Sequence, residues 1–392
     1  MQPPMSLQMS PNGSRAGPQL AAIDVKPGAA LESQSGLQLL RPRIWGALHE
    51  AAPHGGVAAI VMHPASNFMG HYLLAPLAAR GVTCLGLNSR YAGNDTLLLM
   101  ERVLQDLGAG IAFLRERGYT RVLLVGNSGG AALGAYYAAQ SQALTATHFV
   151  HGEPTQLVRA DLPPIDGIAL CAAHEGRSRL LARWIDPALT DEHDPSAVNP
   201  ALDLYGPMHR PPYAASFLAR FAEAQAARLA RIEAWVDARL QALRAEHGAA
   251  SPAADQVFTI HRTHADPRCL DLSIDANDRQ TGSVWGDPQT VNASAYAMGR
   301  VSSLRAFLSQ WSSRSAADGP LNLSRCTHPV LLLTYTADQS TFPSTRQAWL
   351  AAAPGRIRNV DIRGGNHYLA GQPALVDLAA DEIATFAESL SR

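Results

Sequence analysis

Apolar runs and helical stretches alternate along much of this chain. Uninterrupted aliphatic and β-branched runs predict strands buried on both faces at 56–63, 82–88, 121–126 and 165–173. Helices are predicted between them, over 70–80, 96–118 and from the third strand to about residue 140. Such alternation is typical of a parallel sheet covered by helices on both faces. Ahead of it, short apolar stretches between about 19 and 48 predict a leading β-hairpin.

The alternation stops after the fourth strand and resumes near residue 329. In between, residues recurring every three or four positions predict a long amphipathic helix over about 215–243, and they are Leu218, Ala222, Gln225, Leu229, Ile232, Val236, Leu240 and Leu243. Arg228 belongs to its other, polar face. We expect this helix to pack over the sheet domain rather than to form a coiled coil with a partner. Further strands are predicted at 329–334 and 358–362, and further helices at 343–353 and 374–390.

These patterns predict an α/β fold with a mostly parallel central sheet, helices on both faces and an inserted, mainly helical cap. The expected domains are a flexible leader (1–18), a catalytic domain (19–175 and 321–392) and the cap (176–320). Such an insertion would cover the C-terminal edge of the strands, where open α/β sheets bind their ligands.

The charge and hydropathy of the chain narrow the range of partners and locations that can be expected. The 392 residues carry a net charge of -1, so no basic field indicates a nucleic acid or an anionic membrane as a partner. No apolar run reaches the roughly 18 residues of a transmembrane helix, and the first twenty residues do not resemble a secretory signal. We therefore expect a cytoplasmic protein that binds a small molecule, with its oligomeric state open and a homodimer among the alternatives.

Cysteines and lysines restrict the chemistry further. The four cysteines lack pair spacing, so no disulfide framework or zinc site is indicated, and Cys84 and Cys171 lie in apolar strand-like runs where buried thiols are expected. The single lysine, Lys26, excludes Schiff-base and Ser-Lys chemistry. His261, His264 and Asp266 could hold a metal, but a polar loop is the preferred interpretation. Without a glycine-rich dinucleotide or phosphate motif, no cofactor and no metal are expected.

The sharpest motif is Gly126-Asn127-Ser128-Gly129-Gly130, placed between a predicted buried strand and a predicted helix. Such a tight turn exposes the Ser128 hydroxyl, and its glycines let strand and helix approach closely. Because the motif lies at the end of a strand within a sheet series, we interpret Ser128 as a nucleophile.

A serine hydroxyl needs a base, and the base needs an acid that orients it. The best base is His367, in the loop between the last predicted strand and the terminal helix. Asp338 follows the strand at 329–334 and is the preferred acid. Glu175, just past the strand at 165–173, is its competitor.

A tetrahedral intermediate also needs backbone N–H donors. Gly129 would supply one, and the loop after the first core strand, His63-Pro64-Ala65-Ser66-Asn67, would supply the other. Pro64 has no N–H, so Ala65 is the predicted donor and Ser66 the alternative.

The chain resembles the α/β-hydrolase superfamily over roughly 40–175 and 325–392. The resemblance rests on the nucleophile elbow at Ser128, the acid loop at Asp338 and the histidine loop at His367. His63-Pro64 replaces the frequent His-Gly of the family's oxyanion loop. The Asn127-Ser128 pair is also similar to the elbow of hydrolases that cleave carbon–carbon bonds in ring-cleavage products.

The expected function is a cofactor-independent serine hydrolase that cleaves a carboxylic ester with an apolar or aromatic portion through an acyl-enzyme. Carbon–carbon, amide and thioester hydrolysis use the same apparatus and stay open as alternatives. A binder on the same fold that has lost turnover is the alternative from another class. The four cap tryptophans are expected mainly in the core, with one of them a candidate for the pocket wall, and they are Trp184, Trp235, Trp285 and Trp311.

Overall fold

The computed structural model describes residues 17–27, 42–52 and 55–390. The predicted leader lies almost entirely outside this range. The strands of the main sheet are β1 (Gln19–Asp24), β2 (Arg43–His49), β3 (Val57–His63), β4 (Thr83–Asn88), β5 (Arg121–Asn127), β6 (Gly167–Cys171), β9 (Val330–Tyr335) and β10 (Ile357–Ile362). Their order is β1-β2-β4-β3-β5-β6-β9-β10. The β1–β2 and β2–β4 pairs are antiparallel and the other pairs are parallel, so the predicted α/β class and the leading hairpin are both confirmed.

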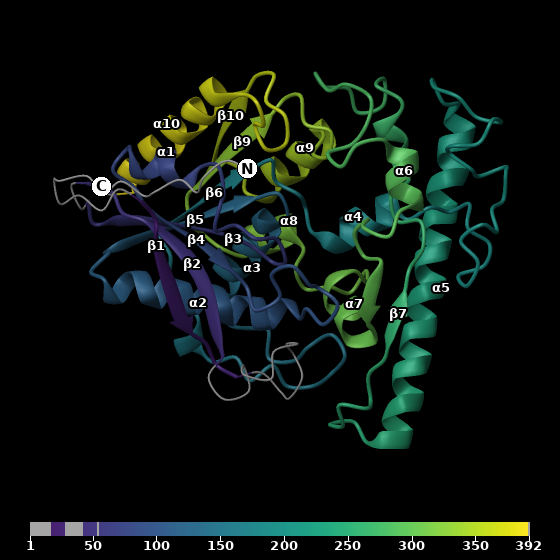
Figure 1. Ribbon diagram of the computed structural model, residues 1–392, viewed down its shortest axis with the longest axis horizontal. Coiled ribbons are helices and arrows are strands. Elements are labelled where there is room, and N and C mark those ends of the chain that lie inside the picture. Colours follow the sequence, from purple (N-terminus) through teal and green to yellow (C-terminus); the bar gives the residue numbers. More distant parts are fainter. Residues whose placement is uncertain (1–16, 28–41, 53–54, 391–392) are drawn as a thin grey trace, which may run out of the picture.

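Helices cover both faces of this sheet (Figure 1). One core lies on the side of α2 (Met100–Glu116), α3 (Gly129–Gln142) and α8 (Gly319–Ser324), and the other lies under α1 (Leu74–Ala78) and α10 (Pro373–Ser389). Successive residues of β3 alternate between the two cores, with Ile60 in the first and Val61 in the second. A strand buried on both faces must be apolar at every position, and this explains the continuous apolar run in the sequence.

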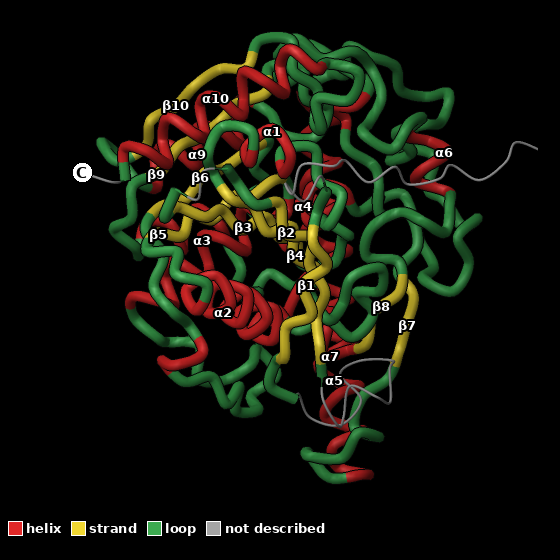
Figure 2. Tube along the Cα trace, turned by 60° about the vertical axis from the view of Figure 1, so that its left-hand side comes forward, coloured by secondary structure: helices red, strands yellow, loops and turns green. Residues whose placement is uncertain are grey.

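A long segment between β6 and β9 stands apart from the main sheet. Its elements are α4 (Arg177–Trp184), α5 (Ala215–His247), β7 (Val257–Thr259), α6 (Pro288–Ala293), β8 (Val301–Ser303) and α7 (Leu304–Gln310). The strands β7 and β8 pair antiparallel into a separate ribbon (Figure 2). After α8, the chain returns to the sheet with β9 and β10, which are connected by α9 (Pro343–Ala352).

The long helix α5 differs from its prediction in what covers it. Leu229, Ile232 and Val236 pack against α4 and α7 rather than against the sheet domain. Figure 1 shows these two helices between α5 and the main sheet. The segment between β6 and β9 therefore has a hydrophobic core of its own.

Two details of the α5 surface also differ. At its N-terminal end the buried stripe is formed by Phe217 and Phe221, not by Leu218 and Ala222. Arg228, expected on the polar face, is fully buried. Its burial is tolerated because the guanidinium donates to the Glu192 carboxylate and to the carbonyl of Asp186. An arginine whose guanidinium is paired in this way can lie on the buried face of a helix.

Two further observations concern the chain as a whole. All four cysteines are free and buried, which confirms the burial predicted for Cys84 and Cys171. Within the described part of the chain, no helix has both the length and the apolarity required to cross a bilayer.

Candidate active site

Ser128 occupies the turn between β5 and α3. Its backbone angles, φ 57° and ψ -125°, lie in a region that residues with a side chain rarely adopt. The conformation is held from both sides: the Ser128 N–H donates to the carbonyl of Cys171 at 3.0 Å, and the Ser128 carbonyl accepts from the N–H of His174 at 3.2 Å. A strained serine at the end of a central strand, lining a cavity although only 7% of it is exposed, is the arrangement expected of a nucleophile elbow.

The flanking glycines are required by close packing. A Cβ on Gly126 would lie 2.7 Å from the Cα of Ala131 in the helix. A Cβ on Gly130 would collide with the carbonyl oxygen of Met62 on β3. The helix can therefore start directly behind Ser128 only because these positions have no side chain.

His367 and Asp338 lie together at the neighbouring strand ends. Nδ1 of His367 is 2.8 Å from Oδ2 of Asp338, and both side chains are buried. The carboxylate also accepts from the N–H of Ser340 at 2.7 Å and from the hydroxyl of Thr341 at 2.6 Å. Burial opposes ionisation of Asp338, but His367 and these hydrogen bonds outweigh it and lower its pKa.

The competing carboxylate, Glu175, has other partners. Its oxygens pair with Arg179 and Arg183, which lie four and eight residues further along the chain in α4. The structure therefore brings Asp338, and not Glu175, to the imidazole of His367.

Ser128 and His367 line one small cavity at the C-terminal edge of the sheet. About 20 Å³ of it is open to a sphere the size of water, which is room for roughly one molecule. Its walls come from the sheet domain and from the inserted segment, and they are His63, Ser128, Gly129, His174, Gly176, Arg177, Leu180, Trp285, Met298, Ser340 and His367. Among the described residues, no hydrogen bond joins the Ser128 hydroxyl to His367. Burial raises the pKa of the neighbouring Tyr368, and a hydrogen bond with the Ser128 side chain opposes this rise.

The predicted oxyanion donors have different surroundings. Gly129 is the first residue of α3, and among the described residues no acceptor takes its N–H. The N–H of Ala65 instead donates to Nδ1 of His63 at 3.1 Å, and the N–H of Ser66 donates to the same atom at 2.9 Å. The sequence thus identified the loop, but its two candidate N–H groups point at a side chain and Ala65 does not line the cavity.

Two further histidines close to Ser128 and His367 are held neutral. Burial, followed by the charge of Arg177 and neighbouring histidines, lowers the pKa of His63 well below its usual 6.5. Burial likewise lowers the pKa of His174 to about 3. His174 contacts Ser340 (Nε2 to Oγ, 2.9 Å), and its ring centroid lies 5.4 Å from that of His367. Sequence patterns did not single out His174 or Arg177, although both lie within six residues of the C-terminal end of β6 and line the same cavity as Ser128.

Aromatic side chains from the inserted segment continue the cavity wall. Trp285 stands edge-on to Trp184 at 5.2 Å, and Trp184 stands edge-on to His264 at 4.8 Å. Trp184 also donates from Nε1 to Asp266 at 3.1 Å. His264 is therefore part of an aromatic cluster rather than a metal site, and no group of three metal-binding side chains occurs among the described residues.

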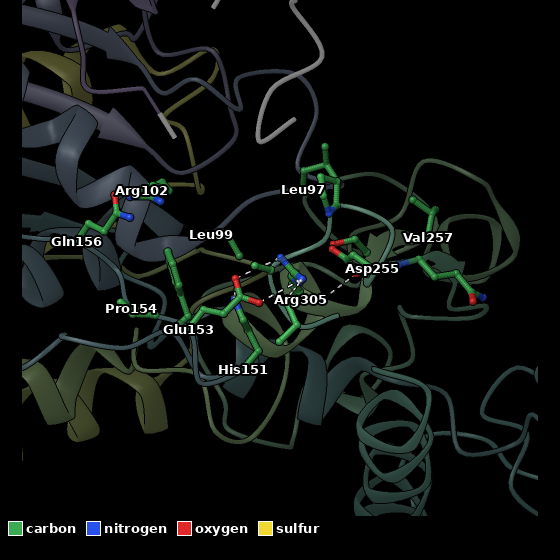
Figure 3. Close-up of a pocket in the computed structure, with 16 residues that line it drawn as sticks. Leu97, Leu99, Arg102, His151, Glu153, Pro154, Gln156, Asp255, Val257 and Arg305 are labelled. Carbon is green, nitrogen blue, oxygen red and sulfur yellow. Dashed lines mark hydrogen bonds and ion pairs between the residues drawn. The ribbon is translucent and has the colours of Figure 1, made fainter. Parts of the chain in front are cut away.

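A second, larger cavity of about 490 Å³ shares no lining residue with the first (Figure 3). It lies where the 149–156 loop meets residues 249–257 and 303–305 of the inserted segment. Arg305 pairs there with Glu153 at 3.1 Å. This ion pair links the inserted segment to the sheet domain away from Ser128.

Comparison with known proteins assigns the fold. No protein-family model and no curated protein matches the sequence. Among solved structures, DcsB in complex with its substrate analogue matches with a TM-score of 0.50 at 11% identity, over 93% of this chain and 98% of DcsB. The chain has the α/β-hydrolase fold. Two other matches are the esterase domain of a Rhodothermus marinus protein (TM-score 0.45, 12% identity, 94% and 98% covered) and proline iminopeptidase of Mycobacterium smegmatis (0.44, 17%, 94% and 98%). The resemblance inferred from the elbow and its partner loops is thus confirmed at the level of the fold.

Proposed function

We propose that this protein is a serine hydrolase that cleaves a carboxylic ester with an apolar or aromatic portion through an acyl-enzyme. One observation carries the proposal: the strained Ser128 lines the same cavity as His367, whose Nδ1 is 2.8 Å from Asp338. The α/β-hydrolase fold supports hydrolysis in general.

In this mechanism the Asp338 carboxylate keeps a proton on Nδ1 of His367, which leaves the lone pair on Nε2. Nε2 takes the hydroxyl proton as Ser128 Oγ attacks the ester carbonyl. The Gly129 N–H stabilises the negative oxygen of the tetrahedral intermediate. His367 then gives the proton to the departing alkoxide and leaves an acyl-Ser128, which water hydrolyses by the same steps.

The walls of the cavity support an apolar acyl or alcohol group. Leu180, Trp285 and Met298 face Ser128 from the inserted segment. Since the cavity holds only about one water molecule, binding of an ester requires these side chains to move apart. An apolar substrate would then regain free energy by filling the space, at roughly 25 cal/mol per Å² buried.

A matched substrate panel tests the proposal. We expect p-nitrophenyl benzoate to be hydrolysed with a kcat/KM about 10²-fold above that of p-nitrophenyl acetate, in line with the area of one buried ring. A ring-cleavage dienoate, included beside them, should turn over more slowly than either ester. Faster cleavage of the dienoate would favour the carbon–carbon hydrolase instead, and absence of turnover on every member would favour the non-catalytic binder.

A further inference from the structure

The hydrogen bonds of His63 determine which of its ring nitrogens carries the proton. His63 ends β3, and its Nδ1 accepts from the N–H groups of both Ala65 and Ser66, at 3.1 and 2.9 Å. A nitrogen that accepts must carry a lone pair, so a neutral imidazole in this position has its proton on Nε2. The surroundings keep the ring neutral, because burial lowers its pKa well below 6.5.

The Nε2–H group lies at the reacting end of the cavity. A Cβ built on Gly129 would be 2.7 Å from His63 Nε2, so this nitrogen rests directly against the backbone that follows the nucleophile. His63, Ser128 and Gly129 line the same cavity. Two donors thus meet beside Ser128: the N–H of Gly129 and the N–H of His63 Nε2.

We propose that the His63 Nε2–H group is the second oxyanion donor, in the role that the sequence had suggested for the backbone of Ala65. This proposal rests on the proposed serine hydrolase function. His63 is then a catalytic residue, because its proton contacts the oxygen that becomes negative. Ala65 and Ser66 are positioning residues, because their N–H groups hold the imidazole in the donating tautomer.

A role for His63 as the general base does not fit its contacts. Its Nε2 is protonated and cannot accept the Ser128 proton, and among the described residues no carboxylate pairs with either ring nitrogen. His367 has the opposite arrangement, with Nδ1 at Asp338. One histidine therefore suits proton transfer and the other suits hydrogen-bond donation.

The loop behind His63 is held firmly enough to aim the ring. The Ser89 hydroxyl donates to the carbonyl of Pro64 at 2.5 Å, and the N–H of Gly93 donates to the carbonyl of Ala65 at 2.8 Å. Donors fixed before the reaction starts stabilise developing charge best, because no reorganisation is needed at that moment.

Two substitutions separate donation from loop positioning. In His63→Asn the amide oxygen can replace Nδ1 as the acceptor for the loop, but no donor remains at the position of Nε2. We expect kcat on p-nitrophenyl benzoate to fall by about 10² to 10³ with a smaller change in KM, as for loss of one oxyanion donor. His63→Gln places an amide donor near the position of Nε2 and should retain more activity. His71→Asn, in the neighbouring loop, is the matched control. Its kcat should stay within about twofold of wild type, which is small beside the loss expected when an oxyanion donor is removed.

The thionoester counterpart of the substrate distinguishes the two roles more sharply, because its C=S sulfur accepts hydrogen bonds weakly. If His63 donates to the oxyanion, His63→Asn should slow the thionoester much less than the oxyester. Equal losses on both substrates would mean that His63 only positions the loop, and wild-type kcat in His63→Asn would likewise overturn the proposal.

The native protein offers a test that needs no variant. In a ¹⁵N-histidine-labelled sample, His63, assigned by its loss in His63→Gln, should be neutral at pH 7 and protonated at Nε2. Its Nε2 proton should shift downfield when a trifluoromethyl ketone adds to Ser128. Protonation at Nδ1 would overturn the proposal. Failure of the ketone and of a fluorophosphonate to modify the wild-type protein would instead reject the serine mechanism itself, so the two failures are distinguishable.

Discussion

At the scale of single residues, the site depends on hydrogen bonds that decide where protons reside. One oxygen of Asp338 accepts from His367, and His367, followed by the Thr341 hydroxyl, lowers the pKa of this buried carboxylate. The backbone N–H groups of Ser340 and Thr341 donate to its other oxygen. Two loop N–H groups fix His63 in the opposite tautomer. The same side chain type is therefore prepared for two different tasks within one cavity.

Replacing each of the two candidate acids by its amide tests the pairing of Asp338 with His367. Asp338→Asn should lower kcat by about 10⁴, because an amide favours the wrong tautomer of His367. Glu175→Gln should leave kcat within about tenfold of wild type but should lower the free energy of unfolding, since Arg179 and Arg183 would lose a buried partner. Steady-state kinetics and urea denaturation of both variants make the comparison. The opposite ranking of kcat would assign the acid to the end of β6.

Sequence reasoning found the elbow and its partner loops because each carries a local pattern at a predictable strand end. Asp338 and His367 meet as their positions after β9 and β10 predicted, since these neighbouring parallel strands end at the same edge. The side chain of His63 was missed because its role depends on the direction in which a ring turns. No spacing of residue types encodes that direction.

At the scale of elements, the sheet and the long helix were predictable, and the packing of the inserted segment was not. The inner strands of the parallel region are apolar on both faces and are recognisable as continuous apolar runs, as β3 is. The position of α5 depends on long-range packing against α4 and α7, which helical periodicity does not contain. The same limit explains Arg228, whose burial requires a carboxylate 36 residues away in the sequence, that of Glu192.

One prediction belongs to the inserted segment. Trp285→Ala should reduce kcat/KM for p-nitrophenyl benzoate by roughly tenfold, because the benzoate ring would lose its contact with an aromatic wall of the cavity. The kcat/KM for p-nitrophenyl acetate should change little. Trp235→Ala is the matched control: Trp235 is 44% exposed, close to the 37% of Trp285, but it packs on Phe258 away from the cavity. Parallel kinetics on both esters supply the measurement. Equal effects of the two substitutions would mean that the insertion does not select the substrate.

At the scale of the whole molecule, buried neutral histidines couple folding to pH. Burial is the largest cause of a lowered pKa in six of them, namely His63, His71, His151, His174, His264 and His328. The unfolded chain binds protons at these positions below about pH 6.5, whereas the folded protein does not. Their contribution to stability is therefore present above pH 6.5 and is lost as the pH falls towards 4. The raised pKa of buried Glu101 acts in the opposite direction, but it is a single group.

Urea denaturation between pH 7.5 and 5 should accordingly show that the free energy of unfolding falls as the pH falls. Each histidine contributes a slope of up to about 1.4 kcal/mol per pH unit. His264→Phe removes one of them in an aromatic cluster where neither ring nitrogen has a partner among the described residues. This variant should keep its fold and show a shallower slope. A slope unchanged by the substitution, or stability that rises on acidification, would contradict the assignment of these histidines as neutral.

The central claim, that Ser128 is the nucleophile, is tested most directly by mapping a covalent adduct. A fluorophosphonate should modify the wild-type protein once, and mass spectrometry of the proteolytic peptides should place the adduct on Ser128. Ser128→Ala should fold with an unchanged circular dichroism spectrum, take up no probe and lose about 10⁶ in kcat. An adduct on another residue, or equal labelling of Ser128→Ala, would contradict the account.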